Sequence, residues 1–281
     1  MLFATPALAQ RIERAEAAML RAATQHAALR DPALPVLDLP VAGGVATFTE
    51  PNSPLNKLFG LGFADALPSD DELEQIEAHL FAQGEAVRAE VSSLADPGLV
   101  ELLSRRGYVL LGFECVLGLA LPAASMPAQA VELVLYESPE RELDTWLDVV
   151  VEGFATPDAE GVGPAEQHER ELLRRIIRDF NRVPGMARYL ARRDGVPAGG
   201  ASMRVGEGVA LLCGAATLPA HRRRGVQTAM LAERLASAAA AGCELAVVTT
   251  QGGSKSMQNA QRRGFELLYV RAVLCRAPPL G

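Results

Sequence analysis

The stretch Val209–Thr228, VALLCGAATLPAHRRRGVQT, predicts more about this chain than any other. Its first part, Val209–Thr217, is almost entirely apolar, which is typical of a central strand buried on both faces. A basic loop follows, and a helix is predicted from Val226 onward. The first N–H groups of a helix have no partner within it and lie at the positive end of its dipole. The stretch therefore indicates a strand–loop–helix unit whose loop can bind an anion.

Three arginines, Arg222, Arg223 and Arg224, stand beside the start of this helix. Cations there oppose the helix dipole at a cost of roughly 0.3–1 kcal/mol each. They could simply solvate the helix start, as most charge runs do, but a bound diphosphate would turn that cost into a gain. Gly225 has no Cβ, so the backbone can approach a ligand closely. We therefore favour a diphosphate site over a solvated surface.

An internal repeat organises the rest of the chain. The segment SRRGYVLL at 104–111 recurs as QRRGFELL at 261–268. R-R-G-aromatic is also an ordinary helix C-terminus, and both interpretations can hold. Before each copy the sequence predicts a helix, a strand and a short helix, at 70–82, 86–91 and 97–105, and again at 226–241, 244–250 and 254–263. We therefore expect a duplicated α/β unit.

The spacing of apolar residues predicts the remaining elements. Leu8, Ile12, Ala15 and Met19 recur at helical intervals and predict a leading amphipathic helix. In the second half, Asp194-Gly195 is a strong turn signal between two strands. The order expected for that half is β-α-α-β-β-β-α-β-α-β-β, beginning with a strand at 131–136, helices at 140–154 and 165–180, and strands at 187–193 and 197–205.

Composition and charge argue against several classes of protein. Lys and Arg number 27 against 34 Asp and Glu, a net charge of −7, whereas proteins that coat DNA or anionic membranes usually have the opposite balance. The four cysteines lie far apart and the four histidines do not gather with them, which argues against a metal site or a disulfide framework and favours a reducing compartment. The sequence has no run of about 18 apolar residues, so no membrane span is predicted. We expect a cytoplasmic protein with no metal, nucleic-acid or membrane partner, and leave a homodimer open.

With the elements in this order, the stretch TLPAHRRRGVQT resembles the loop of the GNAT family of acyl-CoA-dependent N-acetyltransferases, which reads roughly V-x-P-x-x-[RQ]-x-x-G-x-[GA]. Thr217, Pro219, Arg222 and Gly225 take its first four defined positions, while Gln227 replaces the second small residue. The RGF at 263–265 is similar to the family's [KR]-x-G-F ending. The resemblance covers 131–276, and the first half matches only the family's later elements.

The resemblance implies a tandem α/β fold, with a mixed central sheet flanked by helices. Residues 1–125 would form a degenerate GNAT-like half with a leading helix, and 126–281 the N-acetyltransferase domain. The domain would move an acetyl group from acetyl-CoA, its co-substrate, to the amine of a small molecule or peptide. A non-catalytic acyl-CoA-binding or interaction module is the alternative.

The resemblance also implies which residues bind acetyl-CoA. The thioester would enter between the strands at 209–217 and 244–250, with Gln251 and Ser256 as liners. The pantetheine arm would bond to the backbone of Ala216, Thr217 and Leu218. The pyrophosphate would lie on the N–H groups of Arg222, Arg223, Arg224, Gly225, Val226, Gln227 and Thr228.

No catalytic residue is assigned, and Cys213, Glu152 and Ser256 are candidates only. Ala260 occupies the position where many relatives place a proton-donating tyrosine. For the acceptor amine we expect contacts with Trp146, Phe154 and the segment 156–164.

The first half is predicted to bind no CoA. Between its equivalent strand at 57–63 and the helix that follows lies ADALPSDD at 64–71, which has three aspartates and no arginine. Like charges would therefore meet the phosphates.

Overall fold

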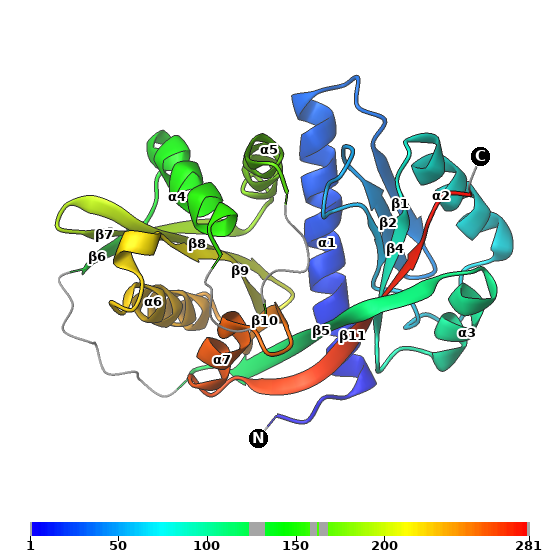
Figure 1. The fold of residues 1–281 in the computed structure, drawn as a ribbon. Coiled ribbons are helices and arrows are strands. Elements are labelled where there is room, and N and C mark those ends of the chain that lie inside the picture. Colours follow the sequence, from blue (N-terminus) through cyan, green and yellow to red (C-terminus); the bar gives the residue numbers. More distant parts are fainter. Residues whose placement is uncertain (1, 124–132, 158–161, 163–167, 280–281) are drawn as a thin grey trace. The chain divides into compact units, whose positions relative to one another are not determined.

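The computed structural model describes residues 2–123, 133–157, 162 and 168–279 (Figure 1). Apart from the first two residues, the chain divides into two compact units, Phe3–Val116 with Leu267–Gly281, and Leu117–Glu266. Each contains both antiparallel and parallel strand pairs with helices on both faces of the strands, so the predicted fold class is confirmed. The units do not coincide with the predicted halves 1–125 and 126–281, because the last strand of the chain belongs to the first unit.

In the first unit, α1 (Pro6–Arg30) lies on one face of the strands, and α2 (Asp70–Ala82) and α3 (Pro97–Arg105) lie on the opposite face (Figure 1). Strand β1 pairs antiparallel with β2, and β2 pairs antiparallel with β3. Strand β4 pairs parallel with β3 and antiparallel with β11. Its elements are α1 (Pro6–Arg30), β1 (Leu37–Val41), β2 (Gly44–Phe48), β3 (Lys57–Phe59), α2 (Asp70–Ala82), β4 (Val87–Ser92), α3 (Pro97–Arg105), and most of β5 (Val109–Ala120) and β11 (Glu266–Arg276).

Local signals explain why α2 and α3 have the predicted bounds. Ser69 Oγ accepts a hydrogen bond from the Glu72 N–H at 3.3 Å, and Glu72 Oε2 accepts one from the Ser69 N–H at 2.8 Å, which is a capping box. Asp96 caps α3, whose first residue is Pro97. Leucines of both helices pack on strand residues such as Phe48 in one core.

Two features of the first unit differ from prediction. The hairpin of β1 and β2 was not expected; its turn residues, Ala42 and Gly43, both have positive φ, as a tight hairpin requires. The strand predicted at 57–63 ends at Phe59, because Gly60 and Gly62 take left-handed conformations.

The second unit repeats this succession of pairings. Each of the strands β6, β7, β8 and β9 pairs antiparallel with the next one along the chain. Strand β9 then pairs parallel with β10, as β3 does with β4. The two strands expected at the end of the chain are one continuous strand, β11. The elements are β6 (Leu133–Glu137), a 3-10 turn (Glu140–Glu142), α4 (Leu143–Ala155), α5 (Arg170–Phe180), β7 (Met186–Arg193), β8 (Val196–Gly206), β9 (Val209–Thr217), a 3-10 turn (Pro219–His221), α6 (Val226–Ala240), β10 (Leu245–Gln251) and α7 (Lys255–Gln261).

A buried ionic cluster joins α1 to β11 inside the first unit. Arg271 is fully buried, and its guanidinium lies 2.8 Å from Glu13 Oε1 and 2.7 Å from Glu16 Oε2. The same guanidinium lies over the ring of Phe59 at 4.5 Å, and the Tyr269 hydroxyl donates to Glu13 at 2.6 Å. The chain's last strand is thus fixed by charge to its first helix.

Glu114 lies at the edge of this cluster, 3.9 Å from Arg271 Nη1. Burial raises the pKa of Glu114 to about 7; the Glu90 carboxylate adds to the rise, while Lys57 and Arg271 oppose it. Because the folded-state pKa lies above the ordinary value of 4.5, the folded protein holds this proton more tightly than the unfolded chain does. The resulting stability is present at pH values below 4.5 and is lost as the pH rises through 7.

Glu114→Gln should therefore remove a pH-dependent loss of stability. About a third of the side chain is exposed, so we expect the variant to gain about 1–2 kcal/mol over the wild type at pH 8. Near pH 4.5 the two proteins should be equal. Urea denaturation at both pH values measures the difference, with Glu101→Gln on the exposed face of α3 as the control. A gain that stays constant with pH would contradict the assignment.

Candidate functional site

The parallel strands β9 and β10 separate before they end. Their register places Val209 opposite Leu245 and Leu211 opposite Val247, and no later residues of these two fully described strands pair with each other. The remainder of β9, 212–217, therefore borders a gap in the hydrogen-bond ladder, as the remainder of β10 does. The predicted splay between these strands is confirmed, and we call it the ladder gap.

A β-bulge in β9 lies beside the ladder gap. Ser202 of β8 pairs with Cys213, but Gly200 pairs with Ala216, so β9 has one more residue than β8 over this interval. The extra length is taken up at Gly214, which has φ +61°, and a Cβ there would lie 2.6 Å from Ser202 Oγ. Such bulges re-aim the strand that contains them.

The end of β9 turns Thr217 toward the ladder gap. The Leu218 N–H donates to the Ala198 carbonyl at 3.0 Å, so Leu218 faces its neighbour β8. Because alternate residues of an antiparallel strand direct their N–H and C=O to opposite edges, Thr217 directs its own away from β8. Of the three backbone positions predicted for the pantetheine arm, Thr217 therefore faces the gap, while the Leu218 N–H is already donated.

The loop after β9 presents free N–H groups at the start of α6. Arg223 and Gly225 both have positive φ, +60° and +77°, and turn the chain into the helix. The first helical hydrogen bond runs from Ala229 to the Gly225 carbonyl at 2.9 Å. No described residue accepts from the N–H groups at 226–228. This is the geometry of an anion site at a helix N-terminus.

The arginines of this loop have different roles. Arg222 is half-buried; its Nε donates to the Thr217 carbonyl at 3.3 Å and its Nη2 to the Thr156 carbonyl just after α4. Arg223 and Arg224 are exposed. Arg222 therefore ties the end of β9 to the end of α4, and the other two carry their charge at the surface.

Side chains from the region of α7 contact the first turn of α6. Arg263 Nη2 donates to Thr228 Oγ1 at 2.9 Å, and Asn259 Nδ2 to Gln227 Oε1 at 3.5 Å. Gln227, which departs from the family pattern, is thus oriented by a contact within the second unit.

Two buried polar atoms beside the loop have no hydrogen-bond partner among the described residues, Thr217 Oγ1 and His221 Nδ1. Buried polar atoms are nearly always hydrogen-bonded, so each indicates a missing partner such as water or a ligand. His221 was not among the residues predicted for the site, and its place in the loop between Pro219 and Arg222 is the signal that points to it.

The three candidate catalytic residues have different neighbours. Cys213 Sγ lies 3.5 Å from Ser202 Oγ, and Ser256 is exposed on α7. Glu152 is paired with Arg170, which lowers the pKa of its carboxyl and keeps it ionised. Ala260, at the position of the relatives' tyrosine, is buried.

The predicted acceptor contacts need one correction. Trp146 is fully buried, and its Nε1–H donates to the Tyr189 carbonyl at 3.1 Å, so it is a core residue. A Cβ on Gly200 would lie 3.1 Å from its Nε1, which shows how closely α4 packs on β8. Phe154 is exposed by 42%. Most of 156–164 lies outside the described residues.

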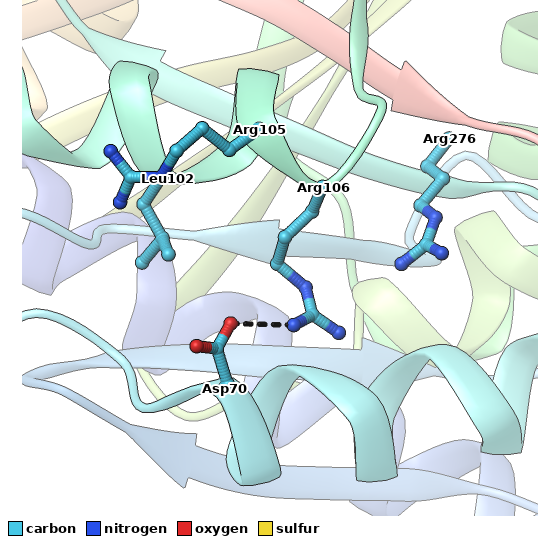
Figure 2. A pocket seen from close by; sticks show the side chains of 5 residues that line it. All are labelled: Asp70, Leu102, Arg105, Arg106 and Arg276. Carbon is cyan, nitrogen blue, oxygen red and sulfur yellow. Dashed lines mark hydrogen bonds and ion pairs between the residues drawn. The ribbon is translucent and has the colours of Figure 1, made fainter.

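The first unit has a cavity of about 420 Å³ between α2 and α3, lined by Asp70, Leu102, Arg105, Arg106 and Arg276 (Figure 2). In the chain order of elements, α2 and α3 correspond to α6 and α7. Arg106 lies 2.6 Å from Asp70 Oδ1 and 2.7 Å from Glu77 Oε2, and Arg276 also pairs with Glu77. Carboxylates of the chain itself thus neutralise two of the three arginines. That the first half binds no CoA stays a prediction, which this pairing supports.

Within the part of the chain that the structure describes, no helix has the length and apolar character needed to cross a bilayer. In the same part, His, Cys, Asp and Glu side chains do not gather in threes as metal ligands do.

Arg222→Ala should destabilise the second unit, because it removes two charge-assisted hydrogen bonds to main-chain carbonyls. We expect a loss of about 1–3 kcal/mol in the free energy of unfolding. Arg224→Ala, two residues away and exposed, is the matched control and should change it by less than about 0.5 kcal/mol. Chemical denaturation compares the two, and equal losses would show that the Arg222 contacts add nothing.

Comparison with known proteins places these features in a family. A search of curated proteins found no match. Residues 151–265 match the sequence model of the acetyltransferase (GNAT) family, a span that includes β9, the loop and α6.

Solved structures match over nearly the whole chain. A GCN5-related N-acetyltransferase from Kribbella flavida is 21% identical, with 94% of this chain and 96% of that one covered and a TM-score of 0.61. One from Sphaerobacter thermophilus is 16% identical, covering 99% and 96%, with a TM-score of 0.58. A tandem GNAT protein from the clavulanic acid biosynthesis pathway is 14% identical, covering 86% and 82%, with a TM-score of 0.58. At these identities the likeness is one of fold. Residues 151–265 are thus a domain of the acetyltransferase (GNAT) family, in a chain with the fold of GNAT structures.

Proposed function

We propose that this protein is an N-acetyltransferase that moves an acetyl group from acetyl-CoA to an amine. The family and the fold support acyl transfer in general. The observation that carries the proposal is that a gap between parallel strands opens beside free N–H groups at the start of a helix. The first feature suits an extended thioester arm and the second a pyrophosphate.

Each part of the donor has matching groups in the second unit. The N–H groups at 226–228 would bind the pyrophosphate, with the exposed charges of Arg223 and Arg224 adding attraction. The Thr217 N–H would bond to the pantetheine amide, while its carbonyl already accepts from Arg222. Arg222 therefore contributes by holding the end of β9 in place rather than by binding phosphate.

The reaction proposed is direct attack by the neutral amine. Its lone pair forms the C–N bond at the thioester carbonyl, and the C–S bond breaks to release CoA thiolate while the amine proton passes to water. A backbone N–H of β9 would stabilise the oxyanion. A thiol has a pKa of ~8.5, so thiolate can leave near neutrality without an acid, at a cost of roughly 10²–10⁴ in rate. This suits a site where Ala260 replaces the proton donor.

Binding of acetyl-CoA can be tested with two glycines that lie at opposite ends of α6. Gly225 and Gly242 both have φ +77°, so valine strains each by about 1–3 kcal/mol. At about 100 times its Kd, acetyl-CoA should stabilise the wild type by about 2.7 kcal/mol. The Gly225→Val variant should lose this stabilisation by acetyl-CoA, because the valine side chain enters the pyrophosphate site. The Gly242→Val variant should keep it. Thermal unfolding with and without ligand measures both.

Calorimetry should give one acetyl-CoA per chain, and two equivalent sites would contradict the assignment of the first unit. Release of CoA with a panel of amines then tests the transfer itself. Binding without turnover on any amine would favour the non-catalytic acyl-CoA module. A shift retained by Gly225→Val would remove the loop from the site.

The pH dependence follows from Ala260, which supplies no acid, and from the need for a neutral amine. Because the amine must arrive neutral, kcat/KM should rise with pH until the acceptor itself is deprotonated, near pH ~10 for a lysine-like amine. Glu152→Gln should leave the profile unchanged, since Arg170 already holds this carboxylate ionised. A bell-shaped profile, with limbs near about pH 6 and pH 9, would show that the protein supplies its own acid and base. Asp148, His168 and Cys213 would then be mutated next.

A further inference from the structure

Arg234 of α6 is a buried cation whose contacts are main-chain carbonyls. It is 3% exposed; its Nη1 lies 3.1 Å from the Ser202 carbonyl and 3.4 Å from the Cys213 carbonyl, and its Nε 3.2 Å from the Met230 carbonyl. Within the described residues no carboxylate pairs with it. Burial lowers the pKa of Arg234 to about 10, so the side chain is still charged at neutral pH.

These contacts converge on the β-bulge of β9. Ser202 and Cys213 are the last pair before the register shifts, and the Cys213 carbonyl accepts from two side chains, Ser202 Oγ at 3.2 Å and Arg234 Nη1. Ser202 is itself buried. Arg234 thus bridges β8 and β9 at the point where the bulge begins.

The bulge decides which residues at the end of β9 face the ladder gap. Side chains and main-chain groups alternate along a strand with a period of two. Without the extra residue, the pairing would shift by one, and Thr217 would direct its N–H and C=O to β8 instead of to the gap. A buried charge is costly unless its partners compensate for lost hydration, so a cation placed here strongly favours the conformation that supplies those carbonyls.

We propose that Arg234 is a positioning residue for acyl transfer, which holds the β9 bulge so that the main chain of Thr217 stays aimed into the ladder gap. The proposal rests on the function proposed above. It concerns a residue that does not touch the thioester, since Arg234 acts through the carbonyls of Ser202 and Cys213.

The test compares Arg234→Met with Leu235→Ala, a buried neighbour on α6 whose side chain has no hydrogen-bond donor for the bulge carbonyls. Arg234→Met should lower kcat at least tenfold and raise the Kd for CoA more than threefold, because the Thr217 N–H that would bond to the pantetheine amide is no longer aimed into the ladder gap. Leu235→Ala should leave both within threefold at a temperature where it is folded. Arg234→Lys, which keeps the charge, should recover at least threefold of the lost kcat.

Amide exchange gives a second readout that needs no substrate. In Arg234→Met the Leu218 N–H should exchange at least tenfold faster relative to that of Ala246 in β10, whereas Leu235→Ala should leave this ratio unchanged. If Arg234→Met does not fold, Ser202→Ala removes another side-chain donor to the Cys213 carbonyl and should shift the ratio in the same direction. An unchanged ratio overturns the proposal. Absence of turnover in the wild type would overturn only the proposed function, because the exchange ratio still decides the role of Arg234.

Discussion

The separation of β9 from β10 beyond Leu211 and Val247 is the constraint on which the candidate site depends. Inside a sheet, each strand normally satisfies the main-chain groups of its neighbour, so a gap leaves N–H and C=O groups that need other partners. The Thr217 carbonyl finds one in Arg222. The groups that remain open lie beside the free N–H groups of α6. This arrangement supports the proposal that an extended ligand with an anionic end binds along the main chain of β9 and the start of α6.

The two units share a succession of elements but differ in the chemistry between their paired helices. In the second, the first turn of α6 has free N–H groups and a basic loop before it. In the first, α2 starts with acidic residues, and Asp70 with Glu77 neutralises Arg106. Carboxylates there pair with the arginine that an anionic ligand would otherwise contact. The second unit thus has the geometry of an anion site at a helix start, whereas the first places carboxylates at the corresponding helix start.

Elements with strong local signals could be predicted within a residue or two. The capping box at Ser69 and the proline at the start of α3 act over one helical turn, and the apolar run of β9 needs no partner to be recognised. The β1–β2 hairpin was missed because its turn, Ala42-Gly43, is not among the strongest turn signals. Trp146 was expected at the acceptor because an aromatic residue on a helix carries no signal of the partner that buries it.

The sequence by itself determined the strand–loop–helix unit at 209–228, the repeat and the family resemblance, because each is recognised from short contiguous stretches and their order along the chain. Only the tertiary structure decided where β11 belongs, since it pairs with β4 and its Arg271 forms ion pairs with Glu13 and Glu16, all distant along the chain. It also decided that the Arg222 side chain donates to the Thr217 carbonyl and that the Arg234 side chain donates to the Cys213 carbonyl at the bulge. One extra residue in β9 reverses the direction of every main-chain group after it. The direction in which these main-chain groups point is set by contacts between distant residues, which spacing along the chain does not reveal.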